Sequence, residues 1–200
     1  MQASLPPASR FTSPVAGGAP RGSVRIALGS EVWQGKIREG RSGKLSNQAL
    51  EGFSRILRFS PTNKRISINP RLLEAVSAVS DHFGGRTLRV VSGYRPPSPR
   101  QHTPHSRHNV GAAVDFIVEG VPNEVLRDFC RTLGNVGVGY YPNSSFVHLD
   151  ARNAPTTWVD YSGPGEAPRY AGPGGQDPDS HHDDDSGGSA IDLPFGRSFL

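Results

Sequence analysis

The sequence predicts an α+β domain in which helices pack on one side of a small antiparallel sheet. Apolar residues recur at helical spacing in three segments, short β-branched runs lie between them, and residues 142–145 have the composition of a hairpin turn. The chain has 24 glycines and 18 prolines, and they are densest at its two ends. We therefore expect a folded domain at residues 23–162, a disordered leader at residues 1–22 and a disordered tail at residues 163–200.

The first predicted elements after the leader are a hairpin and a helix. Residues 24–28 and 31–37 are short alternating runs separated by a Gly-Ser pair, which indicates a small hairpin. Residues 46–59 carry apolar side chains on one helical stripe, and Ser46 is placed to cap the free amides of the first turn. The hairpin and this helix would form the N-terminal part of the domain.

The remaining elements alternate between helical and strand patterns. Asn69 and Pro70 supply a cap and a pre-set first residue for the second helix. Asn123 is expected to cap the third helix. In chain order we predict a helix at 70–83, strands at 87–92 and 111–118, a helix at 123–133, and strands at 136–141 and 146–150.

Composition and charge exclude several classes of function. The net charge of +4 comes from basic residues that are scattered along the chain, so binding to nucleic acid is not expected. The single cysteine, Cys130, rules out a disulfide framework and a thiolate metal cluster. No stretch approaches the roughly 20 apolar residues of a membrane span, and the N-terminus lacks the apolar core of a secretory signal. We expect a monomer that either stays inside the cell or has lost its signal.

Two histidines and an aspartate form the candidate metal site. His108, Asp115 and His148 together could hold a zinc ion and leave a fourth position open for water. Asp115 lies inside a predicted strand and His148 lies between two apolar strand residues, so both side chains could face one cleft. On spacing alone, the alternative is a surface loop histidine and a solvated strand carboxylate.

Three motifs carry a resemblance to a known family. The string S-x-H-x-x-G-x-A-x-D at residues 106–115, SGYR at 92–95 and FVHLD at 146–150 together closely resemble the zinc D-Ala-D-Ala carboxypeptidase and murein endopeptidase family. That family belongs to a larger group with lysostaphin and the hedgehog signalling domain, and the resemblance covers residues 45–161. It implies a hedgehog-like D,D-peptidase fold and hydrolysis of peptidoglycan stem peptides or cross-links in the periplasm or extracellular cell envelope. It also implies that Zn²⁺ is bound by the matching side chains of His108, Asp115 and His148.

The resemblance also implies substrate contacts. The family's matching arginine reaches into the cleft, which assigns Arg95 to a substrate carboxylate or carbonyl, and its guanidinium fork suits either group. An ordinary salt bridge is the alternative for Arg95. Tyr94 and Ser106, from the same motifs, are further candidates for substrate contact, although Tyr94 could instead shape the turn.

One part of the family pattern is missing. Many relatives carry H-x-H, whose first histidine assists the water, but this chain has Phe146 at that position. Asp150 should share a face with His148 and either accept a proton in catalysis or orient His148. His105 is a second candidate for the base, with an exposed loop histidine as the alternative. The missing helper also supports a different function, a non-catalytic zinc-containing module that binds cell-wall peptide.

Overall fold

The computed structural model describes residues 9–12 and 20–170. Most of the predicted leader at 1–22, and the predicted tail from residue 171 onward, therefore lie outside the described residues. In the described part of the leader, a short helix α1 spans Ser9–Thr12, and its Phe11 packs on the hydrophobic core.

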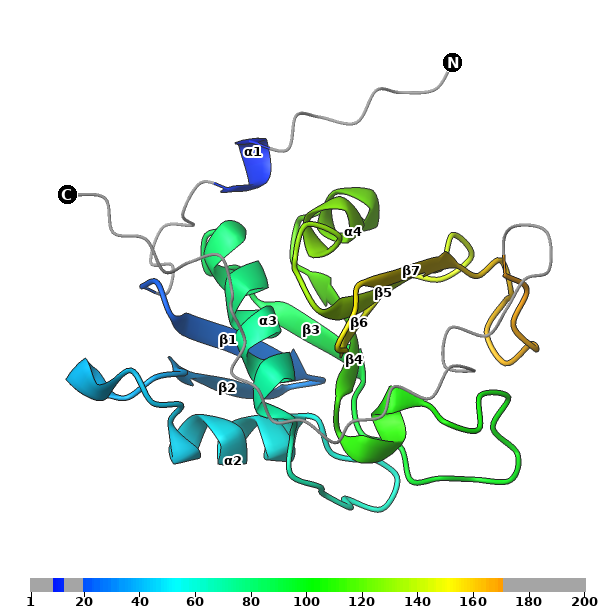
Figure 1. Ribbon diagram of the computed structural model, residues 1–200, viewed down its shortest axis with the longest axis horizontal. Helices are drawn as coiled ribbons and strands as arrows, with labels where there is room; N and C mark the ends of the chain where they lie inside the picture. The colour runs from blue at the N-terminus through cyan, green and yellow to red at the C-terminus, as the bar shows by residue number, and fades with distance from the viewer. Residues whose placement is uncertain (1–8, 13–19, 171–200) are drawn as a thin grey trace.

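Seven strands of the described residues form one sheet in the order β2-β1-β3-β4-β6-β5-β7 (Figure 1). The α+β class is confirmed. The sheet is nevertheless mixed rather than purely antiparallel, because β1 runs parallel to β3 and β5 runs parallel to β7. The strands are β1 (Ser23–Leu28), β2 (Glu31–Lys36), β3 (Leu88–Ser92), β4 (Ala113–Val118), β5 (Val136–Tyr140), β6 (Val147–Ala151) and β7 (Thr156–Val159). The short run that forms β7 was not predicted as a strand.

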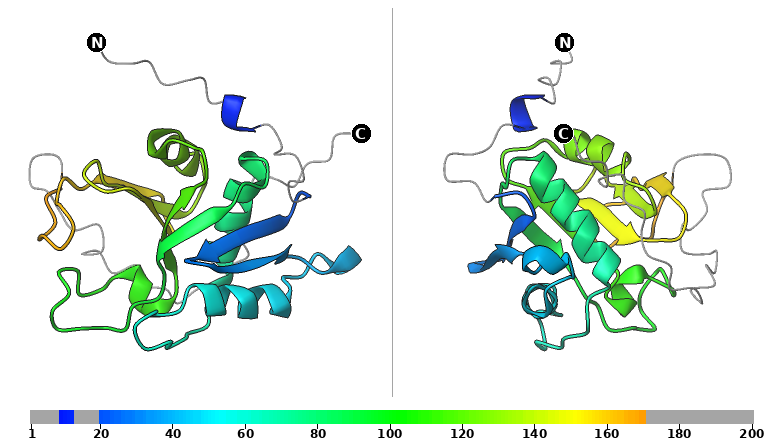
Figure 2. Two further views of the ribbon diagram at one scale, coloured as in Figure 1. Left: turned by 180° about the vertical axis from the view of Figure 1, so that it is seen from behind. Right: turned by 60° about the vertical axis from the view of Figure 1, so that its left-hand side comes forward.

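Three longer helices cover one face of this sheet, and α3 lies across the strands (Figure 2). The buried apolar side chains of all three helices belong to one core cluster with the inward residues of the sheet, as the predicted one-sided packing requires. Within the described residues, no helix combines the length and apolar character needed to cross a membrane. The helices are α2 (Asn47–Ile56), α3 (Pro70–His82) and α4 (Asn123–Cys130), and two 3-10 turns are η1 (Gly40–Ser42) and η2 (Arg107–Val110).

The helix ends follow the predicted caps in part. Asn69 occupies the cap position of α3, and its side chain accepts a hydrogen bond from Arg71 N at 2.9 Å. Ser46 occupies the cap position of α2 but makes no side-chain bond there. In α4 the cap position falls on Pro122, one residue before the predicted Asn123.

Residues 163–170, beyond the predicted domain boundary at residue 162, are linked to the end of β7. Asp160 Oδ1 accepts hydrogen bonds from the backbone amides of Ser162 at 2.9 Å and Arg169 at 2.8 Å. Tyr170 then pairs with Asp160 in an isolated β-bridge. One buried carboxylate thus connects the far end of this glycine- and proline-rich segment to the end of β7.

Candidate metal centre

The candidate site lies on the sheet face opposite the helices. Strand pairing aligns Asp115 with His148, His148 with Gly139, and Gly139 with Trp158. Side chains paired across neighbouring strands point to the same face, so these four residues form one row across β4, β6, β5 and β7. Gly139 leaves the space that this row needs, because a Cβ there would lie 2.6 Å from the Trp158 ring.

A single 3-10 turn presents His108 to this row. The side chain of Ser106 accepts a hydrogen bond from His108 N at 3.4 Å at the start of η2. Gly111 ends the turn at a φ of 68°, a left-handed conformation that glycine adopts without strain. The spacing S-x-H-x-x-G is therefore the length of one capped turn, which fixes the backbone of His108 beside the start of β4.

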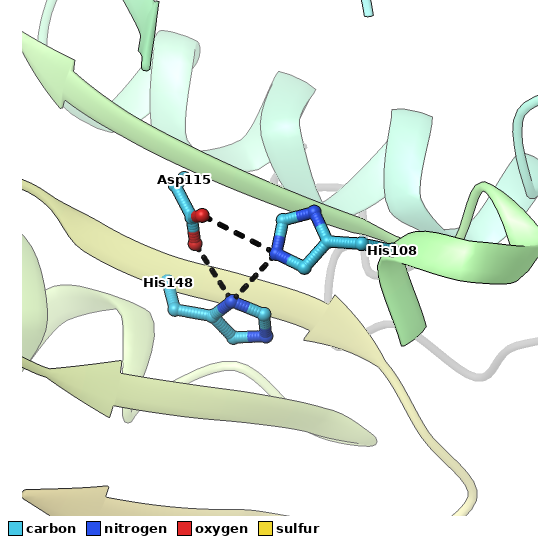
Figure 3. Close-up of side chains that lie close together, drawn as sticks. All are labelled: His108, Asp115 and His148. Atoms are coloured by element: carbon cyan, nitrogen blue, oxygen red, sulfur yellow. Dashed lines mark hydrogen bonds and ion pairs between the residues drawn. The ribbon is translucent and has the colours of Figure 1, made fainter. Parts of the chain in front are cut away.

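The three predicted ligand side chains converge, and all three are buried (Figure 3). His108 Nε2 lies 3.2 Å from His148 Nδ1 and 3.3 Å from Asp115 Oδ2. His148 Nδ1 lies 2.8 Å from Asp115 Oδ1. Two ligands of a tetrahedral zinc ion, with bonds of about 2.0–2.1 Å, are separated by about 3.3 Å. The closest atoms of the three side chains thus lie at this separation or up to about 0.5 Å inside it, and they are of the chemical types that such an ion binds.

Each histidine is oriented by a hydrogen bond from its other ring nitrogen. The carbonyl of Gly93 can only accept, so His108 Nδ1 donates to it at 2.6 Å and leaves Nε2 facing the centre. His148 Nε2 donates to Asp150 Oδ2 at 2.9 Å and leaves Nδ1 facing the centre. Partners of this kind fix the tautomer and ring orientation of histidine ligands in metal sites.

Gly93 explains part of the SGYR motif that sequence analysis left open. A Cβ at this position would lie 2.4 Å from the carbonyl oxygen of Leu57, at the end of α2. Glycine therefore allows the loop after β3 to approach α2 closely and to aim its carbonyl at His108. The next two residues are also held by their backbone, because Tyr94 N donates to Leu57 O at 2.6 Å and Arg95 N donates to His108 O at 3.2 Å.

Mutual contacts govern the charges in the site. Burial lowers the pKa of His108. Burial also works against the charged form of His148, but its hydrogen bonds to Asp115 and Asp150 outweigh this and raise its pKa to about 9. Burial would raise the pKa of Asp115, yet His108 and His148 hold it well below its usual range. The centre therefore stabilises a carboxylate together with one positive charge, and a bound cation would supply that charge in place of the proton.

The centre opens into a cleft of about 460 Å³. Arg95 and Ser106 line this cleft together with the three candidate ligands. Tyr94 does not line it and is only 5% exposed, so its position fits the turn-shaping alternative better than a substrate contact. His105 is exposed and is also absent from the lining, which fits the alternative of a loop histidine.

Phe146 and Asp150 bear on the missing helper histidine. Phe146, which stands where the resemblance led us to expect that histidine, lines the cleft. Asp150 is 0% exposed, and its two oxygens accept hydrogen bonds from His148 and Arg152. A carboxylate so enclosed is better placed to orient His148 than to take a proton from water in the cleft.

Several cleft residues were missed by the sequence analysis. Asp160, near the predicted end of the domain, and Tyr170, beyond it, both line the cleft. Arg152 does not line the cleft, but it contacts Asp150 behind it and was missed as well. For Arg152 the usable signal was the alternation that begins in β6 and puts His148, Asp150 and, one residue past the strand, Arg152 at every second position.

Comparison with known proteins decides the family. A family model described as peptidoglycan L,D-endopeptidase MepK matches residues 33–158, more than half of the chain, and this span includes all three motifs. The chain belongs to this family. It is 32% identical over 111 residues to the probable peptidoglycan L,D-endopeptidase MepK of Haemophilus influenzae. It is 34% identical over 97 residues to the peptidoglycan L,D-endopeptidase MepK of Escherichia coli K12.

The chain spans little more than half the length of these relatives. The aligned part covers 50% of this chain and 60% of the Haemophilus protein, and 44% of this chain and 53% of the E. coli protein. No solved structure matches the chain. The murein endopeptidase resemblance is confirmed at the level of the family. The D,D bond type is not confirmed, because the names of these relatives state an L,D-endopeptidase.

Proposed function

We propose that the protein is a zinc-dependent peptidase that hydrolyses peptide bonds in peptidoglycan. One observation carries this proposal: three side chains of zinc-binding type converge to 2.8–3.3 Å at the wall of a cleft. The family to which the chain belongs, and the names of its relatives, supply the substrate class.

The donor set assigns a part to each group. His108 Nε2, Asp115 and His148 Nδ1 would hold the ion, because these atoms face one another while the opposite ring nitrogens are engaged elsewhere. When bound, zinc would polarise a peptide carbonyl and lower the pKa of water to about 7. Burial of the ligands on one side, with the cleft on the other, leaves access for a peptide.

Arg95 is the proposed substrate anchor. Its backbone is held on both sides, because Arg95 N donates to His108 O at 3.2 Å and Arg95 O accepts from Asn109 Nδ2 at 2.7 Å. Its side chain is exposed in the cleft. A guanidinium presented from a fixed backbone can bind a substrate carboxylate or carbonyl in a defined place relative to the ligands.

Among the reactions that the motifs allow, we propose endopeptidase cleavage at an L,D bond. Both relatives named above are described as L,D-endopeptidases. Carboxypeptidase cleavage of a D,D terminus is the reaction to be separated from it. Because peptidoglycan lies outside the cytoplasmic membrane, this function requires a location in the cell envelope.

Metal content and product analysis test the proposal together. Purified protein should contain one zinc per chain, and its products from purified peptidoglycan should show cleavage at an L,D bond by mass spectrometry. A chelator should stop the reaction and added zinc should restore it. His148→Ala should lose both zinc and hydrolysis, because it removes one of three ligands.

His105→Ala is the matched control, since this histidine is exposed and does not line the cleft. It should keep zinc and activity. Full zinc content in His148→Ala would overturn the ligand assignment. If zinc-loaded wild type binds peptidoglycan without cutting it, the non-catalytic binding module is the correct function.

A further inference from the structure

We propose that Arg152 is a positioning residue of this site. It fixes the carboxylate of Asp150, which in turn orients His148 so that Nδ1 faces the other two ligands. The inference rests on the proposed function, because it takes His148 to be a zinc ligand.

The contacts form a continuous chain. Arg152 is 4% exposed, and its Nε donates to Asp150 Oδ1 at 2.7 Å while its Nη2 donates to Oδ2 at 2.9 Å. The same Oδ2 accepts from His148 Nε2 at 2.9 Å. One guanidinium therefore holds both oxygens of the carboxylate that holds the imidazole.

The two-point contact matters because it fixes the plane of the carboxylate. A single donor leaves a carboxylate free to rotate about its bond to Cβ, whereas a planar fork that donates to both oxygens removes that freedom. The Asp150 oxygen that accepts the hydrogen bond from His148 Nε2 is then fixed in position and direction. Outer partners of metal ligands typically change metal affinity by about 10–100-fold when removed.

The sheet is built to enclose this ion pair. The Arg152 guanidinium lies 5.3 Å from the centre of the Trp158 ring. Gly137 lies against the same ion pair. If it carried a Cβ atom, that atom would lie 2.4 Å from Arg152 Nε and 2.5 Å from Asp150 Oδ2. Gly137 aligns with Asp150 across β5 and β6, so the absence of a side chain at this position makes room for the pair. Both glycines of the V-G-V-G run in β5 therefore make room for a neighbour, because Gly139 leaves space for Trp158 in the same way.

The experiment measures zinc affinity by competition with a chelator in wild type, Arg152→Met and Arg152→Lys. We expect Arg152→Met to weaken zinc binding by about 10–100-fold. Arg152→Lys should fall between the two, because an ammonium keeps the charge but cannot form the planar fork. The unfolding free energy of each metal-free variant shows how much of any effect comes from stability.

A double-mutant cycle with Asp150→Asn separates positioning from a general structural role. If Arg152 acts through the Asp150 carboxylate, Arg152→Met should change the zinc affinity by less than about 3-fold in the Asp150→Asn background. A full and additive loss in that background would overturn the proposal. So would wild-type affinity in Arg152→Met.

The Arg152–Asp150 pair can also be disturbed through Gly137, and each substitution has a matched control. Arg71→Met removes hydrogen bonds to Arg152 O and Asn153 Oδ1 without touching Asp150, and should leave the zinc affinity unchanged. Gly137→Ala should weaken zinc binding by displacing the ion pair, whereas Gly134→Ala, which meets nothing within 4 Å, should not. Equal affinities in Gly137→Ala and Gly134→Ala would count against the proposal. Failure of the wild type to bind zinc would instead overturn the proposed function, and this inference with it.

Discussion

The two faces of strands β4 and β6 are about equally buried but have opposite chemistry. Toward the helices, Phe116 and Leu149 are fully buried in an apolar core. Toward the cleft, Asp115, His148 and Asp150 are also buried, with no more than 7% of any of them exposed. Successive strand residues point to opposite faces of the sheet. Alternate residues of the same two strands therefore form the apolar face and the polar face.

The comparison shows how a buried polar face is tolerated. Burial of an unpaired charge is costly, whereas the charges on the cleft side contact one another at 2.7–3.3 Å. Burial would raise the pKa of Asp150, but hydrogen bonds from His148 and Arg152 hold it at about 2. The helix side of the sheet thus stabilises the fold through apolar contacts. On the cleft side, each charged side chain is tolerated because its neighbours pair with it.

The largest predicted effect comes from the helix side. Phe116→Ala removes a fully buried ring, and should lower the free energy of unfolding by about 3–5 kcal/mol. Ile117→Ala, at the neighbouring position on the opposite face, is the control and should cost clearly less because Ile117 is partly exposed. Chemical denaturation with a chelator present measures both. Similar losses for the two variants would contradict the assignment of faces.

A smaller, zinc-dependent effect should come from the cleft side. At a free zinc concentration 100 times the Kd, the wild type should gain about 2.7 kcal/mol of unfolding free energy relative to the chelated protein. Asp115→Ala should gain almost nothing, because one ligand is lost. Phe116→Ala, if it remains folded, should keep most of the gain, since its ring faces the other side. A zinc-dependent gain in Asp115→Ala that matched the wild type would exclude Asp115 as a ligand.

Most of the secondary structure and the candidate ligands could be predicted because local signals specify them. Asn69 and Pro70 mark the start of α3, and the alternation around His148 indicates its face. The residues alone suggested the convergence of His108 with the two strand residues but left a surface histidine as the alternative, and the family resemblance favoured the metal site. No local pattern in the sequence states which distant segments become neighbours.

The features that the sequence did not predict depend on contacts between distant segments of the chain. The parallel pairs β1–β3 and β5–β7 join strands that are separated by other elements. No turn motif connects the two strands of a pair, so no local pattern predicts the pairing. Arg152 was missed because arginine is rarely buried unless it is paired, and its partner is known only once the face of β6 is set. The role of Gly93 was hidden for the same reason, because its carbonyl acts on a residue 15 positions away.

The smallest predicted effect concerns a carboxylate on the helix side that lacks the partners of Asp150. Asp81 lies in the last turn of α3 with its side chain exposed, and partial desolvation raises its pKa, although the amide of Gly22 and the charge of Arg21 oppose this. A carboxyl whose pKa is raised on folding stabilises the fold while protonated, and this contribution is lost as pH rises from about 4 through the folded pKa. Asp81→Asn keeps an acceptor for Gly22 N and removes a negative charge from a helix C-terminus, which is worth about 0.3–1 kcal/mol.

The Asp81→Asn variant should therefore be more stable than wild type at pH 7 and about equal to it at pH 3. Denaturation curves across this range measure the difference, which should grow with pH as the wild-type carboxyl ionises. A difference that stayed constant with pH would mean that Asp81 has the same pKa in the folded and unfolded states. That result would remove the contrast with Asp150, because partial desolvation would then not disfavour an exposed carboxylate that lacks strong partners.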